Sequence, residues 1–271
     1  MKQRILRNHM ASAVLTLLLV TGILAGCATS GVNRGDVNLI SVQEEWRLGQ
    51  QLEAEVARQM QLVNDPQALA YINQMGRAIV AQTEMRNLPW EFHIVRDPAI
   101  NAFNIPGGHV YVNTGLIQAA DNAAELAGVM AHEIAHGVAR HGTERISRAY
   151  GLNIVASLVL GQNPSLVEQI VGQIVAGGAM AKFSRDDERE ADRLGVRYMA
   201  AAGYNPMGMA NMFEKLLSTR GRQPSRVSQF FSTHPLTEER IREVTQLASQ
   251  MNTSGLRMND SGFATLKSRT R

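Results

Sequence analysis

The sequence is poor in cysteine. Cys27 is the only cysteine among the 271 residues, so the chain cannot form an intramolecular disulfide, whatever the redox state of its compartment. The length is sufficient for one large domain or two small ones.

Residues 27–271 have no formal net charge. Lys2, Arg4 and Arg7 account for the whole formal net charge of +3, because residues 1–26 contain no acidic residue. The remainder holds 24 basic and 24 acidic residues. The sequence pI of 9.2 is therefore mainly a property of the N-terminal segment. It gives no support to nucleic-acid binding.

The apolar runs are short for a membrane span, which takes about 20 residues. A basic start followed by the apolar run at 10–26 is typical of a secretory signal, with an uncleaved anchor helix as the alternative. A second apolar region, residues 151–183, is interrupted by GQNPS. We expect this region to form a helical hairpin packed on the core, with a membrane-inserting hairpin as the alternative.

The residues around the single cysteine, LAGC at 24–27, resemble the lipobox of bacterial lipoproteins. The resemblance implies that residues 1–26 are a signal peptide and that Cys27 is lipidated. In Gram-negative lipoproteins, Asp directly after the lipidated cysteine is a signal for retention at the inner membrane. This chain has Ala28 there, which favours sorting to the outer membrane. We therefore expect a lipid-anchored protein on the periplasmic face of the envelope. The small and polar residues at 27–40 would be its tether.

Hydrophobic periodicity and capping residues predict an α+β fold that is mainly helical. Two capping signals support the assignment of helices: Ser41 with Glu44, and Asn122 with Glu125. Gly142 is a suitable end for the helix that begins after Asn122. Further helices are expected at 66–83, from 184, at 209–218 and from 237, strands at 90–97 and 106–113, a loop at 221–236, and a loosely ordered tail at 251–271.

A metal-binding pattern lies inside the helix that follows Asn122. The sequence HEIAH places His132 and His136 four residues apart, so that both imidazoles lie on one helix face and can reach one tetrahedral cation. Glu133 projects beside that position, where it can hold a water molecule. The same five-residue pattern also arises by chance, so a third ligand is needed.

Glu188 is the best candidate for the third ligand. It has Asp192 one helical turn later, which can orient a ligating histidine, whereas Asp187 and Glu190 have no such partner at that offset. His141 is excluded as a ligand on a continuous helix. Five residues beyond His136, it is rotated by about 140° from the ligand face.

Four motifs together resemble the M48 family of zinc metalloendopeptidases, which are gluzincins. They occur in the order NAFNIPGGHVYVNTGLI, HEIAH, SRDDEREAD and THPLTEER, within residues 40–245. The resemblance implies a metallopeptidase domain at 41–250 with a small β-sheet bordering the active-site cleft, and one Zn²⁺ per chain. It makes His132, His136 and Glu188 the zinc ligands, Glu133 the general base and Asp192 the supporting acid.

The resemblance also points to residues around the cleft. PGGHVYVNTG matches the strand that borders the cleft, so His109 and Asn113 are candidates for substrate binding, with solvent-facing or edge-strand positions as the alternative. His234 is expected either to stabilise the oxyanion or to act as a movable fourth ligand that blocks the water site. Arg240 is a weaker candidate for the same work.

The expected activity is zinc-dependent hydrolysis of peptide bonds, with polypeptide substrates that the resemblance suggests are misfolded envelope proteins. The alternative is a latched, chaperone-like binding factor for outer-membrane or periplasmic proteins. Glu133 argues for an enzyme, because a protein that only binds has no need of a general base.

Overall fold

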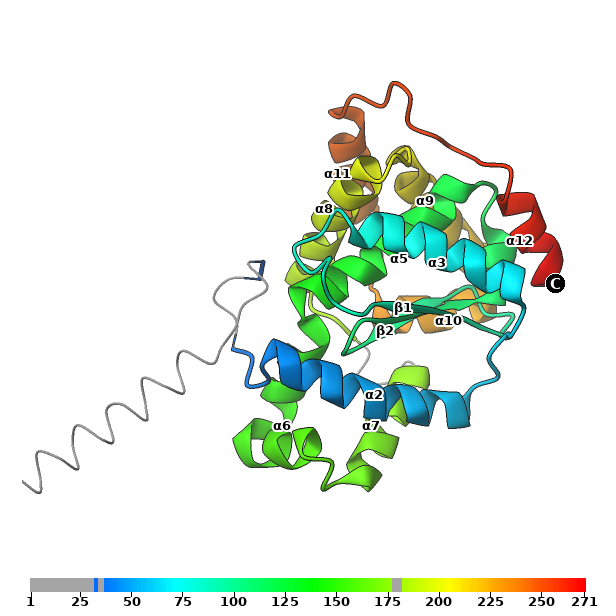
Figure 1. The fold of residues 1–271 in the computed structure, drawn as a ribbon. Coiled ribbons are helices and arrows are strands. Elements are labelled where there is room, and N and C mark those ends of the chain that lie inside the picture. Colours follow the sequence, from blue (N-terminus) through cyan, green and yellow to red (C-terminus); the bar gives the residue numbers. More distant parts are fainter. Residues whose placement is uncertain (1–31, 34–36, 177–181) are drawn as a thin grey trace, which may run out of the picture.

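The computed structural model describes residues 32–33, 37–176 and 182–271. The expected signal peptide, Cys27 and most of the expected tether lie outside the described residues. In chain order the elements are α2 (Val42–Gln59), α3 (Pro66–Val80), β1 (Glu91–Val95), β2 (Ala102–Ile105), β3 (His109–Asn113), α4 (Thr114–Ala119), α5 (Ala123–Ala139), α6 (His141–Val159), α7 (Pro164–Val175), α8 (Arg185–Ala201), α9 (Met207–Arg222), α10 (Pro224–Thr233), α11 (Glu238–Ser249) and α12 (Phe263–Arg269) (Figure 1).

The three strands of the described sheet lie in the order β1-β3-β2. The central strand β3 is parallel to β1 and antiparallel to β2. Because side chains alternate along a strand, Val110 and Val112 join the core on one face of the sheet, while Tyr111 joins a second core on the other. Helices α3 and α5 cover the first face, and α2 covers the second (Figure 1). This mainly helical architecture with a small sheet confirms the predicted fold class.

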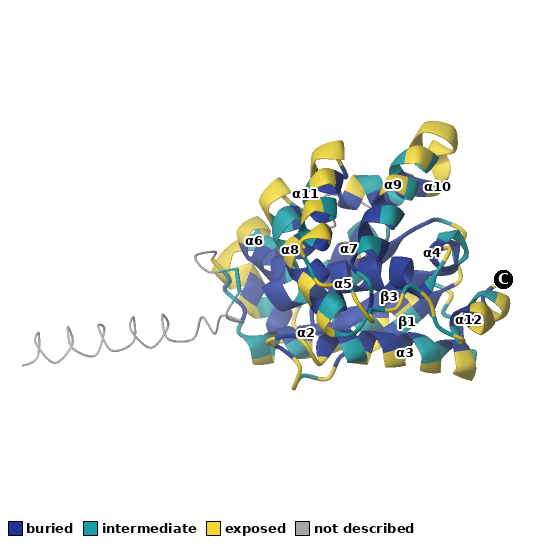
Figure 2. Ribbon diagram, turned by 90° about the horizontal axis from the view of Figure 1, so that it is seen from above, coloured by how far each residue is buried: buried dark blue, intermediate teal, exposed yellow. Residues whose placement is uncertain are grey.

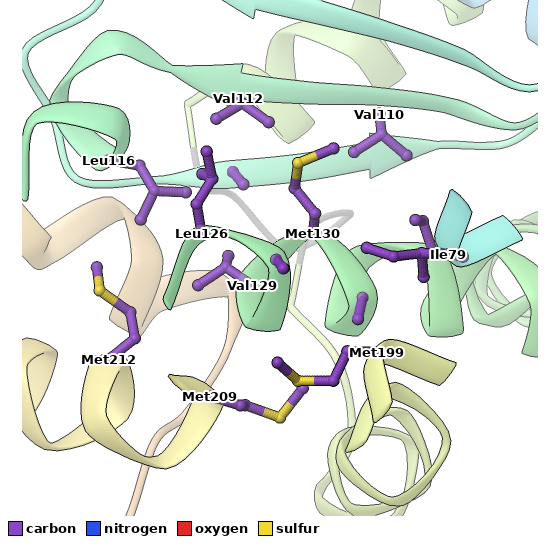
Figure 3. Close-up of a cluster of buried hydrophobic side chains, with 14 of the residues drawn as sticks. Ile79, Val110, Val112, Leu116, Leu126, Val129, Met130, Met199, Met209 and Met212 are labelled. Atoms are coloured by element: carbon purple, nitrogen blue, oxygen red, sulfur yellow. The ribbon is translucent and has the colours of Figure 1, made fainter. Parts of the chain in front are cut away.

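Helix α5 lies at the centre of the molecule and is buried on almost every side (Figure 2). Leu126 and Met130 point toward Val110 and Val112 of the sheet, and Met209 lies across the opposite face of the helix (Figure 3). A helix that is buried all round is normally apolar throughout. The charged and polar side chains on α5 therefore need partners that compensate for their loss of water.

Helix α5 ends earlier than predicted. Its last residue is Ala139, and Arg140 has a left-handed backbone with φ of 63°. The buried Arg140 guanidinium donates a 2.6 Å hydrogen bond to Glu45, and this ion pair holds the otherwise unfavourable conformation. The chain therefore turns at Arg140, and a new helix begins at His141, one residue before the expected stop at Gly142.

The apolar region at 151–183 forms a helical hairpin, as predicted, over the part that the structure describes. Helix α6 changes direction at Gly151, where φ is 67°, and both α6 and α7 pack against α2. None of the helices within the described ranges combines the length and the apolar character that crossing a membrane requires.

Two segments are more regular than predicted. The expected loop at 221–236 contains α10, whose Val227 and Phe230 are buried. The tail at 251–271, expected to be loosely ordered, contains α12. Although the segment is mostly polar, its Phe263 and Leu266 are buried in the main core. They anchor α12, which packs on α3 and α4.

Replacing Phe263 tests whether this C-terminal helix is part of the core. We expect Phe263→Ala to lower the free energy of unfolding by about 3–5 kcal/mol, because it opens a cavity in a packed site. Urea unfolding followed by circular dichroism measures the change. The exposed Thr265 on the same helix is the control, and Thr265→Ala should alter stability by less than about 0.5 kcal/mol. A loosely attached tail would make the two variants indistinguishable.

Candidate active site

The two histidines of α5 and the glutamate of α8 converge as predicted. His132 Nε2 and His136 Nε2 are 3.1 Å apart. Glu188 approaches both, with Oε2 3.5 Å from His132 Nε2 and Oε1 3.4 Å from His136 Nε2. The close approach of α8 depends on Gly195, because a Cβ at that position would lie 3.1 Å from the backbone nitrogen of His132. All three ligand side chains are buried.

His234 completes a group of four donors. It follows α10, and its Nδ1 lies 3.3 Å from His132 Nε2 and 2.9 Å from Glu188 Oε1. In tetrahedral coordination with zinc–ligand distances near 2.1 Å, neighbouring ligand atoms are about 3.4 Å apart. The donor types and their spacing therefore fit one tetrahedral metal ion.

Glu133 lies beside this group on the next position of α5. Its Oε1 is 3.3 Å from His234 Nε2, and its Oε2 has no hydrogen-bond partner among the described residues. Burial raises the pKa of the Glu133 carboxyl. A carboxylate whose pKa is raised toward neutral pH is suited to take up a proton and to return it.

Asp192 supports the first ligand. Its Oδ1 lies 3.0 Å from His132 Nδ1, so it fixes which nitrogen of the ring faces the metal position. Arg240 donates two hydrogen bonds to the Asp192 carboxylate, 2.7 and 2.8 Å long, and also pairs with Glu188. Although burial alone would raise the pKa of Asp192, the Arg240 charge and His132 lower it. Arg240 thus anchors the two acids, a role different from the oxyanion role considered for it.

The second ligand has a supporting pair that sequence reasoning missed. His136 Nδ1 lies 2.9 Å from His141 Nδ1, and His141 Nε2 lies 3.2 Å from Glu190 Oε2. His141 reaches this position because the chain turns at Arg140, whereas a continuous helix would have pointed it away. His141 is not one of the four grouped donors, but it lies behind the His136 ring and fixes its orientation. Glu190 is the partner of His141, a contact that the predicted continuous helix through Gly142 did not suggest.

The cleft beside Glu133 lies between the edge strand β2 and the α6–α7 hairpin. The Asn104 amide of β2 donates a hydrogen bond to the Glu133 carbonyl. The lining combines polar side chains with three isoleucines. It consists of Phe103, Asn104, Pro106, Glu133, Gly142, Ile146, Ile170, Ile174, Phe183, Thr233 and His234.

His109 and Asn113 do not line this cleft. Both are buried on the central strand β3, which already pairs on both sides, so an extended substrate cannot add to it. They share the strand face of Tyr111, away from α5. The expected substrate-binding role is therefore corrected, because the edge beside the cleft is β2. The motif NAFNI contained that strand but is too short to show alternation.

The sequence is similar to those of known peptidases. The model of a family described as peptidase family M48 matches residues 66–248. The beta-barrel assembly-enhancing protease of Escherichia coli (strain K12) is 28% identical over 262 residues, which cover 92% of this chain and 54% of that protein. The mitochondrial metalloendopeptidase OMA1 of Schizosaccharomyces pombe is 32% identical over 217 residues, covering 79% of this chain and 64% of that protein. The chain spans about half the length of the bacterial relative.

Asp192 offers a test of how the first ligand is held. We expect Asp192→Asn to weaken metal binding by about 10- to 100-fold, because the amide keeps the shape but loses the charge that orients His132. Competition with a chromophoric zinc chelator measures the affinity. The exposed Asp186 on the same helix is the control, and Asp186→Asn should leave the affinity unchanged. Equal zinc affinities for both variants would show that Asp192 does not contribute to metal binding.

Proposed function

Because this chain belongs to peptidase family M48, we propose that it is a zinc-dependent metalloendopeptidase that hydrolyses peptide bonds with a metal-activated water. The observation that carries the proposal is the convergence of His132, His136 and Glu188 on one point, with Glu133 beside it. Members of this family are metal-dependent peptidases. The choice of zinc rests on the donor set, since two imidazoles and one carboxylate are typical of catalytic zinc sites.

In this mechanism His132, His136 and Glu188 would hold one metal ion. A zinc ion bound there would polarise the scissile carbonyl and lower the pKa of a water molecule toward about 7. Glu133 takes a proton from the attacking water and passes it to the leaving amine. Its Oε2, which has no hydrogen-bond partner among the described residues, and its buried position suit both transfers. Asp192 and the His141–Glu190 pair hold the two imidazoles in place throughout.

His234 regulates access in this proposal. Its Nδ1 stands where a fourth ligand would be, which is the position that the attacking water needs. The ring must therefore swing away before a substrate can react. Once displaced, it can donate a hydrogen bond to the developing oxyanion, so the two roles considered for His234 become successive.

The substrate is proposed to be an unfolded or misfolded polypeptide of the cell envelope. An extended backbone can pair with the edge of β2 that no other described strand occupies, next to Glu133. The name of the Escherichia coli relative connects that protein with β-barrel assembly, which supports an envelope role here. We further propose that Cys27 is lipidated and anchors the chain to the periplasmic side of the outer membrane.

A second function has one observation in its favour. With His234 in the fourth position, the protein can persist in a latched state that binds clients and cleaves few of them. In this form it would act as a chaperone-like binding factor for envelope proteins. The two functions differ in what Glu133 contributes, since binding alone does not use a base.

Replacing the proposed base separates the two functions. We expect Glu133→Gln to lower cleavage of an unfolded protein such as casein at least about 100-fold, because no group takes the water proton. The active-site zinc should remain bound. The control is Glu214→Gln, an exposed site that should retain full activity. Undiminished cleavage by the Glu133 variant would contradict the mechanism. A zinc-loaded wild type that binds casein without cleaving it would favour the binding factor.

Replacing His234, the proposed latch, should change the cleavage rate in the opposite direction. We expect His234→Ala to increase casein cleavage by about tenfold, with the gain from loss of the closed state outweighing the lost oxyanion hydrogen bond. The reason is that a water molecule can then occupy the fourth position without competition. Initial rates at equal zinc content measure the effect. A lower rate with zinc retained would mean that His234 acts chiefly on the oxyanion.

A further inference from the structure

A second group of metal-binding side chains lies on the sheet, outside the active site. Glu91 and His93 are on β1 and His109 is on β3. Glu91 and His109 are direct partners in the parallel register, and His93 is two residues beyond Glu91, so the three side chains share one face. This face is opposite to the one that α5 covers, because it also carries Tyr111 of the second core.

The donor atoms of the three residues face a common point. One ligand atom from each lies within 4.8 Å of the others. Glu91 Oε2 is 3.7 Å from His93 Nε2 and 3.9 Å from His109 Nδ1, too far for hydrogen bonds. Both of these imidazole nitrogens are buried and have no hydrogen-bond partner in the part of the chain that the structure describes. Two unsatisfied buried nitrogens at one place are costly unless something binds them.

The two imidazoles are prepared for coordination. Burial lowers the pKa of His93, and burial together with His93 lowers the pKa of His109 to about 4, so both rings are neutral at pH 7. Neutral imidazole is the form that binds metal. The His93 ring is also held in orientation, because it stacks on Tyr111 at 4.7 Å, and Tyr111 stacks on Phe103 at 4.8 Å.

The local charge favours a cation. Glu91 is half exposed and supplies one negative charge at the rim. Glu53, on α2, has a pKa that is raised by burial and then by the negative charge of Glu91. A divalent ion beside Glu91 would relieve this repulsion while it satisfies the two histidines.

We propose that Glu91, His93 and His109 form a second metal site that binds a divalent transition-metal ion such as Zn²⁺. Two imidazoles and one carboxylate suit zinc and its neighbours, whereas Mg²⁺ and Ca²⁺ prefer all-oxygen sites. The ion would join β1 to β3. The stack from His93 through Tyr111 to Phe103 connects this site with the active-site cleft, which Phe103 lines.

Zinc stoichiometry tests the site independently of catalysis. Full-length protein is dialysed against buffered micromolar Zn²⁺, and bound zinc is measured by mass spectrometry of the metal. We expect two ions per chain in the wild type, one in His136→Ala, one in His109→Gln and none in the double variant. One ion in the wild type, lost in His136→Ala and retained in His109→Gln, would overturn the second site and leave the proposed function intact.

A second variant covers the case in which His109→Gln does not fold, since His109 is buried. Glu91→Gln changes a half-exposed side chain and should weaken the second ion at least tenfold in the His136→Ala background. Glu214→Gln is the matched control in that background and should leave zinc binding unchanged. Equal zinc affinity in both would show that any second ion is adventitious and would overturn the proposal.

Discussion

The structure depends on the burial of a polar ligand set inside helix α5. His132, Glu133 and His136 lie in a helix that contacts protein on almost every side, so water cannot compensate their polar groups. Compensation comes from α8, which brings Glu188 and Asp192 to the same point. This pairing requires close helix packing, as the short distance across Gly195 demonstrates. The arrangement of the helices around α5 thus follows from the need to surround one charged centre.

Each of the two α5 histidines is held in place by its own series of contacts on the side away from Glu188. His132 contacts Asp192, and Asp192 accepts hydrogen bonds from Arg240. The positive charge of Arg240 thus compensates the two buried acids Asp192 and Glu188. His136 leads to His141 and Glu190, close to the surface. These two series of contacts run in different directions, so rotation of either ring would break a separate set of polar contacts. Such fixation is what allows a metal site to keep its geometry while a substrate enters.

The sequence was most informative where a residue type has a narrow chemical purpose. HEIAH and the spacing of Glu188 and Asp192 predicted residues that lie together in the structure, and Ser41 with Glu44 forms the predicted capping box. Prediction failed where a tertiary contact decides the backbone. The turn at Arg140 depends on Glu45, which is distant in sequence, and without that turn His141 could not be placed. His109 was misplaced because strand order, which puts β3 in the centre, is not encoded locally. The tail helix depends on two buried residues among many polar ones.

The position of the metal is the most direct test of the account. Crystals of the zinc-loaded protein, measured on both sides of the zinc absorption edge, give the location of each ion from its anomalous signal. We predict a peak about 2.1 Å from His132 Nε2, His136 Nε2 and one oxygen of Glu188, with Asp192 in contact with the opposite nitrogen of His132. An ion that is bound without Glu188, or the absence of any ion between α5 and α8 in zinc-loaded crystals, would contradict it.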